Sequence, residues 1–428
     1  MRKKVLIIAY YWPPAGGPGV QRWLKFVKYL PEFNIDPVVV VPENPNYPIV
    51  DESLKAEISK GVEVIKIPIS EPYKLASIFS KGKTNTISKG IINTQKKQSL
   101  LEKAMLFVRG NFFIPDARVG WVAPVTSFLL DYMPKKDINT IITTGPPHSM
   151  HLIGLNVKEK LDVKWLADFR DPWTTIGYHK QLKLTASSVK KHKSLENQVL
   201  SKADYVTVTS SVTKSEFKTI THQPITVITN GYDNEVADVT VLDDKFTLAH
   251  IGSLLSKRNP EILWKALSEL LIEHDNFKAD FQLNLVGYVS DEVLESINTY
   301  KLTDYVNKIG YVSHSESIKY QKQSQVLVLI EINSEETKCI IPGKLFEYMV
   351  SNRPIIAIGP KDSDVETILK ETNTGAYFEY DTYENLKNTI LEYYNAFKAN
   401  NLKSFPIGLQ KYHRKSLTNT LSQLLWEL

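Results

Sequence analysis

Short runs of apolar, often β-branched residues alternate along the chain with longer segments in which apolar residues recur at helical spacing. The first series of predicted strands is Val5–Tyr11, Pro37–Val41, Val62–Ile67, Asn139–Thr144, Val163–Asp168, Tyr205–Thr209 and Ile225–Thr229. The second series is Phe246–Ile251, Phe281–Val286, Val306–Ile309, Val326–Ile330, Pro354–Ile358 and Gly375–Phe378. The predicted helices include Val20–Leu30, Val189–Leu200, Pro260–Glu273 and Val365–Glu371. Strands that are apolar on both faces and separated by helices are typical of parallel sheets covered on both sides. The pattern therefore predicts an α/β protein with two doubly wound domains.

The boundary between the two domains is expected near Tyr232–Lys245, where acidic residues cluster without apolar periodicity. Polar connections of this kind are typical of domain joins. We therefore predict one domain over residues 1–232 and a second over residues 233–411. The last segment, Ser416–Leu428, has leucines at helical spacing and is predicted to be a packed amphipathic helix.

Composition narrows the class of protein. The 428 residues are 43% hydrophobic, which suffices for a substantial core and excludes a mainly disordered chain. Cys339 is the one cysteine, so neither an internal disulfide nor a cysteine-based metal site can form. The 52 Lys and Arg residues exceed the 47 Asp and Glu residues by only five, too mild an excess to indicate a nucleic-acid partner.

Two segments of the sequence bear on where in the cell the protein is located. The charged start followed by Val5–Tyr11 superficially resembles a signal peptide, but Pro13 and Pro14 follow where small residues before a cleavage site are needed. We expect a buried strand there instead, and a cytoplasmic protein, which suits a lone thiol. Lys74–Gly110 has eight basic residues and one acidic residue among interspersed apolar ones. Two interpretations stay open for this segment: a solvated surface insertion, or a surface that contacts anionic lipid at the inner face of the plasma membrane.

Polar residues at predicted strand ends are the candidate functional groups of the first domain, because ligands of doubly wound folds bind at the carboxyl ends of the strands. The Gly16–Gly19 loop places backbone amides near a ligand or makes only a tight turn. His148 and His151 are proton carriers or hydrogen-bond donors to a sugar, or they are structural. In the Asp168–Trp173 segment, Asp168 and Arg170 form an ion pair or serve a ligand, and Asp171 is left to face a ligand hydroxyl.

The second domain has its own candidates. Lys257 and Arg258 precede a predicted helix, where the helix dipole disfavours cations unless an anion binds. In the Pro342–Tyr348 segment, Lys344 could neutralise a phosphate and Glu347 could accept hydrogen bonds from a ribose diol. The alternative is an exposed Lys–Glu pair that contributes little. The Asp362–Asp364 segment has a D-x-D form, but its place before a predicted helix favours a cap, so no metal site is predicted.

Taken in chain order, these segments resemble bacterial family 4 glycosyltransferases, which are retaining enzymes of the GT-B architecture. The segments that carry the resemblance are Pro13–Arg22, Pro115 with Asp116, Gly120 with Trp121, Gly145–Ser149, Asp168–Trp173, Ala203–Thr209, Thr229–Asp233, Gly252 with Ser253, and Pro342–Tyr348. The resemblance implies two Rossmann-like domains facing each other across a cleft. It further implies a nucleotide-sugar donor, a UDP- or GDP-sugar, on residues 233–411, and a glycan or lipid-linked acceptor on residues 1–232. Residues 412–428 would fold back onto the N-terminal domain.

The resemblance also assigns expected roles to residues. The donor-binding set is Gly16, Gly17, Gly252, Ser253, Arg258, Pro342, Gly343, Lys344 and Glu347. The acceptor-side set is His148, Arg170 and Trp173, and the catalytic set is Asp168, Asp171, Arg258 and Lys344. Neither a cofactor nor a metal ion is expected, so Arg258 and Lys344 would stabilise the leaving diphosphate.

One departure from the family pattern concerns its pair of glutamates. Glu347 matches the second glutamate of the family's E-x7-E motif, but Cys339 stands where the first would be. The expected function is retaining, metal-independent transfer of a hexosyl or N-acetylhexosaminyl group in polysaccharide biosynthesis. The alternatives are a non-catalytic nucleotide-sugar-binding subunit, suggested by Cys339, and a nucleotide-sugar epimerase of the same architecture.

Overall fold

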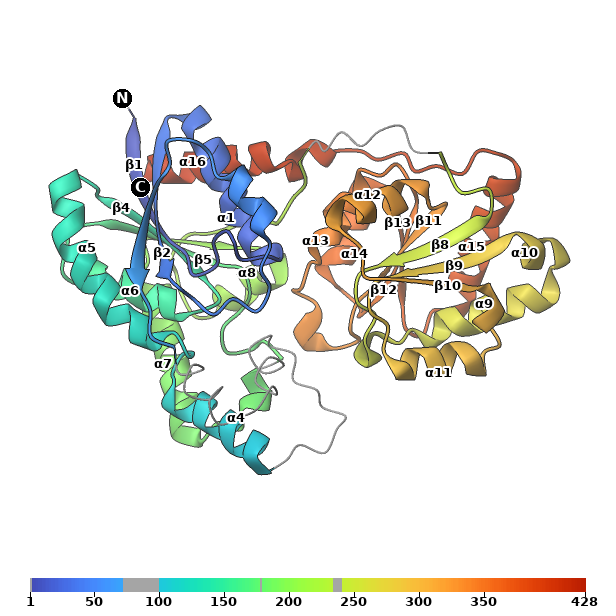
Figure 1. Cartoon of the computed structure of the whole chain (residues 1–428), viewed down its shortest axis with the longest axis horizontal. Helices are drawn as coiled ribbons and strands as arrows, with labels where there is room; N and C mark the ends of the chain where they lie inside the picture. The colour runs from blue at the N-terminus through green and yellow to red at the C-terminus, as the bar shows by residue number, and fades with distance from the viewer. Residues whose placement is uncertain (1, 72–99, 178, 234–240) are drawn as a thin grey trace. The chain divides into compact units, whose positions relative to one another are not determined.

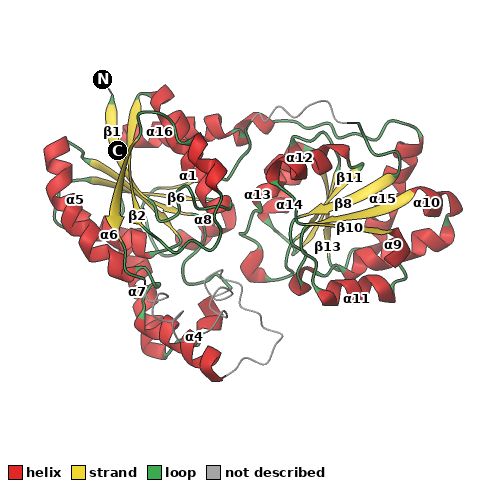
Figure 2. Cartoon of the chain, in the orientation of Figure 1, coloured by secondary structure: helices red, strands yellow, loops and turns green. Residues whose placement is uncertain are grey.

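The computed structural model describes residues 2–71, 100–177, 179–233 and 241–428. The chain forms two compact units (Figure 1). The first comprises Met1–Asn230 together with Arg414–Leu428, and the second comprises Gly231–His413. Each unit contains a single parallel sheet with helices on both faces (Figure 2). The prediction of two Rossmann-like domains is therefore confirmed.

The sheet of the first unit has seven strands in the order β3-β2-β1-β4-β5-β6-β7. Its strands are β1 (Lys3–Ile8), β2 (Ile35–Glu43), β3 (Glu63–Pro68), β4 (Thr140–Gly145), β5 (Lys164–Phe169), β6 (Tyr205–Val208) and β7 (Ile225–Val227). Its helices are α1 (Pro18–Tyr29), α4 (Leu100–Phe112), α5 (Val122–Lys136), α6 (Ser149–Lys158), α7 (Ala186–Lys202), α8 (Ser211–Phe217) and α16 (Arg414–Glu427). Short 3₁₀ helices lie at Leu30–Phe33, Glu52–Glu57, Val119–Trp121 and His179–Leu182.

The sheet of the second unit has six strands in the order β10-β9-β8-β11-β12-β13. Its strands are β8 (Phe246–Ile251), β9 (Phe281–Val286), β10 (Val306–Gly310), β11 (Val326–Ile330), β12 (Ile355–Gly359) and β13 (Gly375–Glu379). Its helices are α9 (Glu261–Glu273), α10 (Asp275–Asp280), α11 (Asp291–Thr299), α12 (His314–Gln323), α13 (Gly343–Met349), α14 (Asp364–Thr372) and α15 (Tyr383–Lys398). Short 3₁₀ helices lie at Ser256–Arg258, Thr303–Tyr305, Glu335–Thr337 and Leu409–Tyr412.

Alternation along the central strands explains why both faces of each sheet are covered. In β1, Leu6 and Ile8 belong to one buried cluster, whereas Val5 and Ile7 belong to another on the opposite face. β11 divides in the same way between the two clusters of the second unit. Because side chains of a strand point alternately to opposite faces, a strand that is apolar throughout needs helices on both sides.

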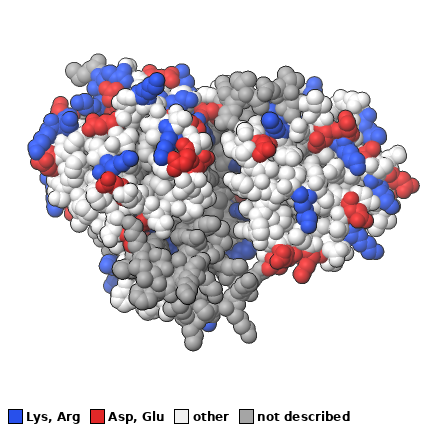
Figure 3. All heavy atoms as spheres, viewed as in Figure 1, with Lys and Arg blue, Asp and Glu red and all other residues white. Residues whose placement is uncertain are grey.

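The C-terminal helix α16 packs on the first unit. Its apolar stripe, with Leu421 and Leu425 fully buried, joins the cluster that contains Trp23 of α1. Lys415 pairs with Glu32 at 2.5 Å. Charged side chains of both signs are intermixed over the visible face of each unit (Figure 3), in keeping with the small net charge.

The basic segment Lys74–Gly110 lies mostly outside the described residues, and its described part begins at α4. Phe107 and Phe112 on this helix are exposed by 41% and 73%. Among the residues that the structure describes, no helix combines the length and the apolar character needed to cross a lipid bilayer. Contact with anionic lipid stays a prediction.

Candidate active site

The carboxyl end of β8 is shaped by glycines. Gly252 follows the strand with φ +116°, a conformation that favours glycine. Its carbonyl also lies so close to Gly287, at the end of β9, that a Cβ on Gly287 would stand 2.7 Å from the carbonyl oxygen. Ser253 comes next and is exposed. At Gly252 and Gly287 the two strand ends therefore present backbone rather than side chains.

Lys344 of α13 reaches across the end of β8. Its Nζ donates to the Ile251 carbonyl oxygen at 2.9 Å and lies 3.4 Å from Nε2 of buried His250. His250 Nδ1 is 3.1 Å from the Val328 carbonyl oxygen, which can only accept, so Nδ1 carries the hydrogen and Nε2 accepts from Lys344. Burial lowers the pKa of Lys344 to about 7, repulsion from Arg258 adds to this effect, and Glu347 opposes it.

Arg258 is the second cation of this edge. It ends the 3₁₀ helix Ser256–Arg258 and interacts electrostatically with Lys344. Burial lowers its pKa, while Glu331 and Tyr380 act in the opposite direction. Its buried Nε has no hydrogen-bond partner within the described residues. Two neighbouring cations, of which Lys344 contacts a carbonyl oxygen and a histidine nitrogen, form a place where an anion would be stabilised.

Glu347 lies one turn after Lys344 on α13. Its carboxylate accepts from Gln321 at 2.9 Å and lies 3.1 Å from Nε2 of His314. Pro342 and Gly343, which begin this helix, are half-buried. The structure thus brings Gly252, Arg258, Lys344 and Glu347 into one site at the edge of the second sheet; that they bind a donor stays a prediction.

Glu331 is a residue of this site that was not predicted. It follows β11 directly and is 4% exposed, with hydrogen bonds from Ser363 at 2.9 Å and Tyr377 at 2.8 Å. Burial raises its pKa to about 7, against the effect of those hydrogen bonds and of Arg258. A charged residue at or near the end of an apolar strand is the signal that could have revealed Glu331, as it revealed Asp168. Cys339, in contrast, is half-buried and contacts the Glu336 carbonyl oxygen at 3.7 Å.

Ser363 also caps α14, since its side chain accepts from the Val365 amide. The Asp362–Asp364 segment therefore contains the predicted helix cap, with the serine as the capping residue. No group of three or more His, Cys, Asp or Glu side chains is arranged to hold a metal ion in the parts of the chain that the structure describes. Metal independence stays a prediction.

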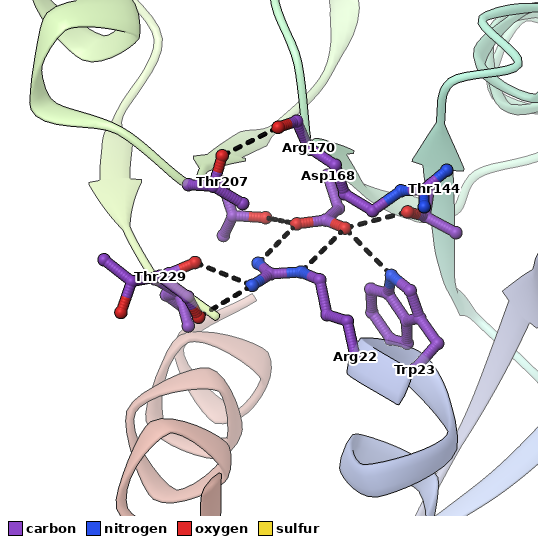
Figure 4. A network of polar contacts seen from close by, with 9 residues as sticks. Arg22, Trp23, Thr144, Asp168, Arg170, Thr207 and Thr229 are labelled. Atoms are coloured by element: carbon purple, nitrogen blue, oxygen red, sulfur yellow. Dashed lines mark hydrogen bonds and ion pairs between the residues drawn. The ribbon is translucent and has the colours of Figure 1, made fainter. Parts of the chain in front are cut away.

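In the first unit, Asp168 is the centre of a buried polar network (Figure 4). Its carboxylate accepts from Arg22 at 2.8 Å, from Trp23 at 2.8 Å, from Thr144 at 2.8 Å and from Thr207 at 2.9 Å. The ion-pair alternative for Asp168 named the wrong cation, because its partner is Arg22 of α1 and not Arg170. Burial raises the pKa of this carboxyl, but Arg22 and the hydrogen bonds hold it below its ordinary value. A saturated, fully buried carboxylate favours a structural role over the predicted catalytic one.

Arg170 and Asp171 follow this network at the end of β5. The Arg170 side chain donates to the Pro146 carbonyl and lies over the Tyr11 ring. Burial raises the pKa of Asp171, and Arg170 opposes that rise. Asp171 has no hydrogen bond among the described residues and is half-buried, so it is the predicted catalytic carboxylate that stays available to a ligand.

Predicted acceptor-side residues pack into a cluster of buried rings. His148 stacks on Trp173 with ring centroids 4.9 Å apart, and Trp173 donates to Nδ1 of His192 at 3.2 Å. Both ring nitrogens of His148 lack a hydrogen-bond partner within the described residues. Burial lowers the pKa of His148 well below its ordinary value, as does the neighbouring His151. These rings are therefore neutral at pH 7, which excludes His148 as a source of positive charge there.

Acidification should lower the stability of the first unit through these rings. In the unfolded chain, histidines take up protons near pH 6.5, whereas burial lowers the pKa of His151 to about 3 and of His192 to about 4. The unfolded state then binds more protons below pH 6.5, so the free energy of unfolding falls as pH falls, by up to ~1.4 kcal/mol per pH unit for each histidine. Denaturant unfolding at pH 7, 6 and 5 measures this slope.

Two acids oppose the effect, because burial raises the pKa values of Asp171 and Glu196. The informative comparison is therefore between variants and the wild type. In His192→Gln, the free energy of unfolding should fall less steeply as pH falls than in the wild type. In His222→Gln, at an exposed position, the slope should equal that of the wild type. An identical slope for the wild type and His192→Gln would contradict the prediction.

Gly16 and Gly17 lie before α1 in the first unit. The Gly16 amide donates to the Ile49 carbonyl at 3.0 Å, and a Cβ there would stand 2.9 Å from the Ile49 side chain. Gly17 has φ +95°. Both glycines are thus needed for the turn itself, and their contact with a donor stays a prediction.

Comparison with known proteins supports the interpretation of the second unit. Residues 245–396 match the family model described as Glycosyl transferases group 1. Among curated proteins, none matches this sequence.

Solved structures extend the likeness to the whole chain. A sucrose-phosphate synthase from Thermosynechococcus elongatus has 14% identity and a TM-score of 0.62, over 100% of this chain and 99% of that chain. Anabaena HepE in complex with UDP-glucose has 12% identity and a TM-score of 0.59, over 99% and 100%. A putative UDP-N-acetylglucosamine 2-epimerase from Listeria monocytogenes has 12% identity and a TM-score of 0.55, over 100% and 98%. The chain therefore has the GT-B fold, and its residues 245–396 match the glycosyl transferases group 1 model; together these findings support a glycosyltransferase family.

Proposed function

We propose that this protein is a retaining, metal-independent glycosyltransferase of family 4. It transfers a hexosyl or N-acetylhexosaminyl group from a UDP- or GDP-sugar to a polysaccharide or lipid-linked glycan. The observation that carries the proposal is the grouping of Arg258, Lys344 and Glu347 at the carboxyl edge of the second sheet. The family match over the same residues and the UDP-glucose complex of a protein with the same fold support it.

The proposed chemistry follows from the charges. Cleavage of the anomeric bond leaves negative charge on the departing diphosphate, and fixed cations stabilise that charge without reorganisation. Arg258 and Lys344 take this role, and Glu347 accepts hydrogen bonds from the pentose. The acceptor hydroxyl attacks from the face that the diphosphate leaves, and a diphosphate oxygen takes its proton, so the anomeric configuration is kept.

The acceptor side of the proposal rests on the first unit. Asp171 at the end of β5 is the carboxylate that could orient an acceptor hydroxyl, with Arg170 next to it. We place the reaction in the cytoplasm, at the inner face of the plasma membrane, because basic and apolar residues are interspersed in residues 74–110.

Replacing Glu347 by glutamine should weaken nucleotide binding and transfer by at least tenfold while the fold is kept. A neutral amide presents one acceptor instead of two, and it loses the charge that strengthens hydrogen bonds from hydroxyls. Calorimetry with UDP and GDP, followed by transfer assays with the sugar nucleotide of the tighter binder, measures the effect. Exposed Glu335→Gln is the control, and undiminished turnover by the Glu347 variant would refute the assignment.

An epimerase is the second candidate, favoured by the structural likeness to the putative 2-epimerase. An epimerase converts the donor without an acceptor, so incubation with UDP-N-acetylglucosamine alone separates the two. A changed nucleotide sugar would favour the epimerase, and slow hydrolysis to UDP and free sugar would favour the transferase.

A non-catalytic subunit is the third candidate, because Cys339 replaces a family glutamate. Nucleotide-sugar binding without turnover against any glycan or lipid extract would favour that candidate. Retention itself is tested by the anomeric configuration of the first product, read by NMR before mutarotation.

A further inference from the structure

Helix α12 holds both oxygens of the Glu347 carboxylate. The Gln321 side-chain amide donates to Oε2 at 2.9 Å, and His314 Nε2 lies 3.1 Å from Oε1. The two residues come from the same helix, on which they lie two turns apart. Glu347 is on α13, so the contact fastens the carboxylate to a second element.

The two contacts differ in their exposure. Gln321 is 3% exposed, so packing fixes its amide, whereas the His314 side chain is 60% exposed. The Glu347 side chain lies between these values, at 31%. A buried amide therefore sets the orientation of a carboxylate whose outer side is open to a ligand.

A carboxylate held in this way keeps its capacity for a ligand. Each carboxylate oxygen has two lone pairs and can accept more than one hydrogen bond. A carboxylate with a fixed orientation suits two neighbouring hydroxyl groups, which is the chemistry of the 2′ and 3′ positions of a ribose. Fixing the carboxylate in advance removes the ordering cost that binding would otherwise carry.

We propose that Gln321 is a positioning residue of the donor site, which aims Glu347 at the ribose diol of the nucleotide. The proposal rests on the proposed function, because it takes Glu347 as the ribose-binding group. It adds α12 to the donor site and makes the discrimination of ribose from deoxyribose depend on a residue that does not touch the nucleotide.

The test compares UDP with 2′-deoxy-UDP by calorimetry, or GDP with 2′-deoxy-GDP if GDP gives the larger thermal shift. The wild type should bind the ribonucleotide about tenfold more tightly, since one hydrogen bond to a charged group is lost in the deoxy form. Glu347→Gln should erase the preference. Gln321→Leu should reduce it severalfold, and should add nothing in a Glu347→Gln background because the two residues act as a unit.

Matched controls separate positioning from folding. Gln323→Leu, on the same helix, should keep the full preference, and melting temperatures report whether each variant folds. If Gln321→Leu loses the fold, Gln321→Met, which is closer to glutamine in shape, takes its place. A general loss of stability would weaken both nucleotides equally and leave their ratio unchanged.

The outcomes distinguish the donor-site assignment of Glu347 from the positioning role of Gln321. If Glu347→Gln keeps the preference for ribose, the donor-site assignment itself fails. If Glu347→Gln loses the preference but the Gln321 variants keep it, the donor site stands and the role of Gln321 is overturned. An effect of Gln321→Leu that persists in the Glu347→Gln background would also overturn that role.

Discussion

Replacing Lys344 by methionine is expected to lower transfer from a nucleotide sugar by about 10²–10³-fold, the usual loss when one fixed donor to a developing anion is removed. The ammonium lies at the end of β8 on the Ile251 carbonyl oxygen, with Arg258 as the other cation. Methionine keeps most of the side-chain volume but neither donates nor carries charge. Steady-state rates with the donor varied measure the loss.

A matched control and a pH series sharpen this prediction. Lys361→Met, at an exposed position of the same unit, should leave the transfer rate unchanged. Because burial lowers the pKa of Lys344 to about 7, the free protein loses the ammonium form as pH rises above 7. Donor affinity should then fall by up to about tenfold per pH unit above 7. Lys344→Arg stays charged, so its donor affinity, although lower because the guanidinium is larger, should be flat from pH 7 to pH 9.

Equal rates for Lys344→Met and the wild type would remove Lys344 from the reaction. A wild-type donor affinity that does not change from pH 7 to pH 9 would leave the charge of Lys344 unlinked to binding. The first result bears on the role of the residue and the second on its protonation in the free protein, so neither can be mistaken for the other.

The strand pattern was readable from sequence because both faces of each sheet are buried. Leu6 and Val5 in β1 pack in different clusters, so burial demands an unbroken apolar run. Such runs are the strongest local signal that a parallel sheet leaves. Asp168, near the end of β5, was found for the same reason: its carboxylate interrupts the apolar pattern at the edge where ligands bind.

The interaction partners of the polar residues were harder to predict than their positions at the strand ends. One alternative paired Asp168 with Arg170, two residues away, but its cation is Arg22, which lies 146 positions earlier in the chain. Residues two apart on a strand share a face, so the local pattern suggests that they pair. The actual ion-pair partner depends on which helix packs over that face. Gln321 was missed for a related reason, since a single glutamine in a polar helix carries no signal until the fold places it beside Glu347.

Replacing Asp168 by asparagine is expected to cost about 3–5 kcal/mol of unfolding free energy, because it leaves Arg22 buried without its counter-charge. The shape is nearly unchanged, so the loss comes from hydrogen bonding and charge. Oδ1 accepts from Arg22 and Thr207, and Oδ2 accepts from Arg22, Trp23 and Thr144. Whichever oxygen becomes an NH₂ group then faces an N–H of Arg22, which cannot reverse its role as a hydroxyl can.

Hydrogen exchange of the β4, β5 and β6 amides, together with calorimetric unfolding, localises this loss to the first unit. Asp131→Asn is the control: its exposed pair with Lys135 on α5 should contribute less than about 1 kcal/mol. Replacing Arg22 and Asp168 together by methionine and leucine should recover part of the stability, because a buried ion pair removed as a whole leaves no unpaired charge. If Asp168→Asn unfolds like the wild type and yet loses transfer activity, Asp168 acts in the reaction and the structural interpretation of this network is wrong.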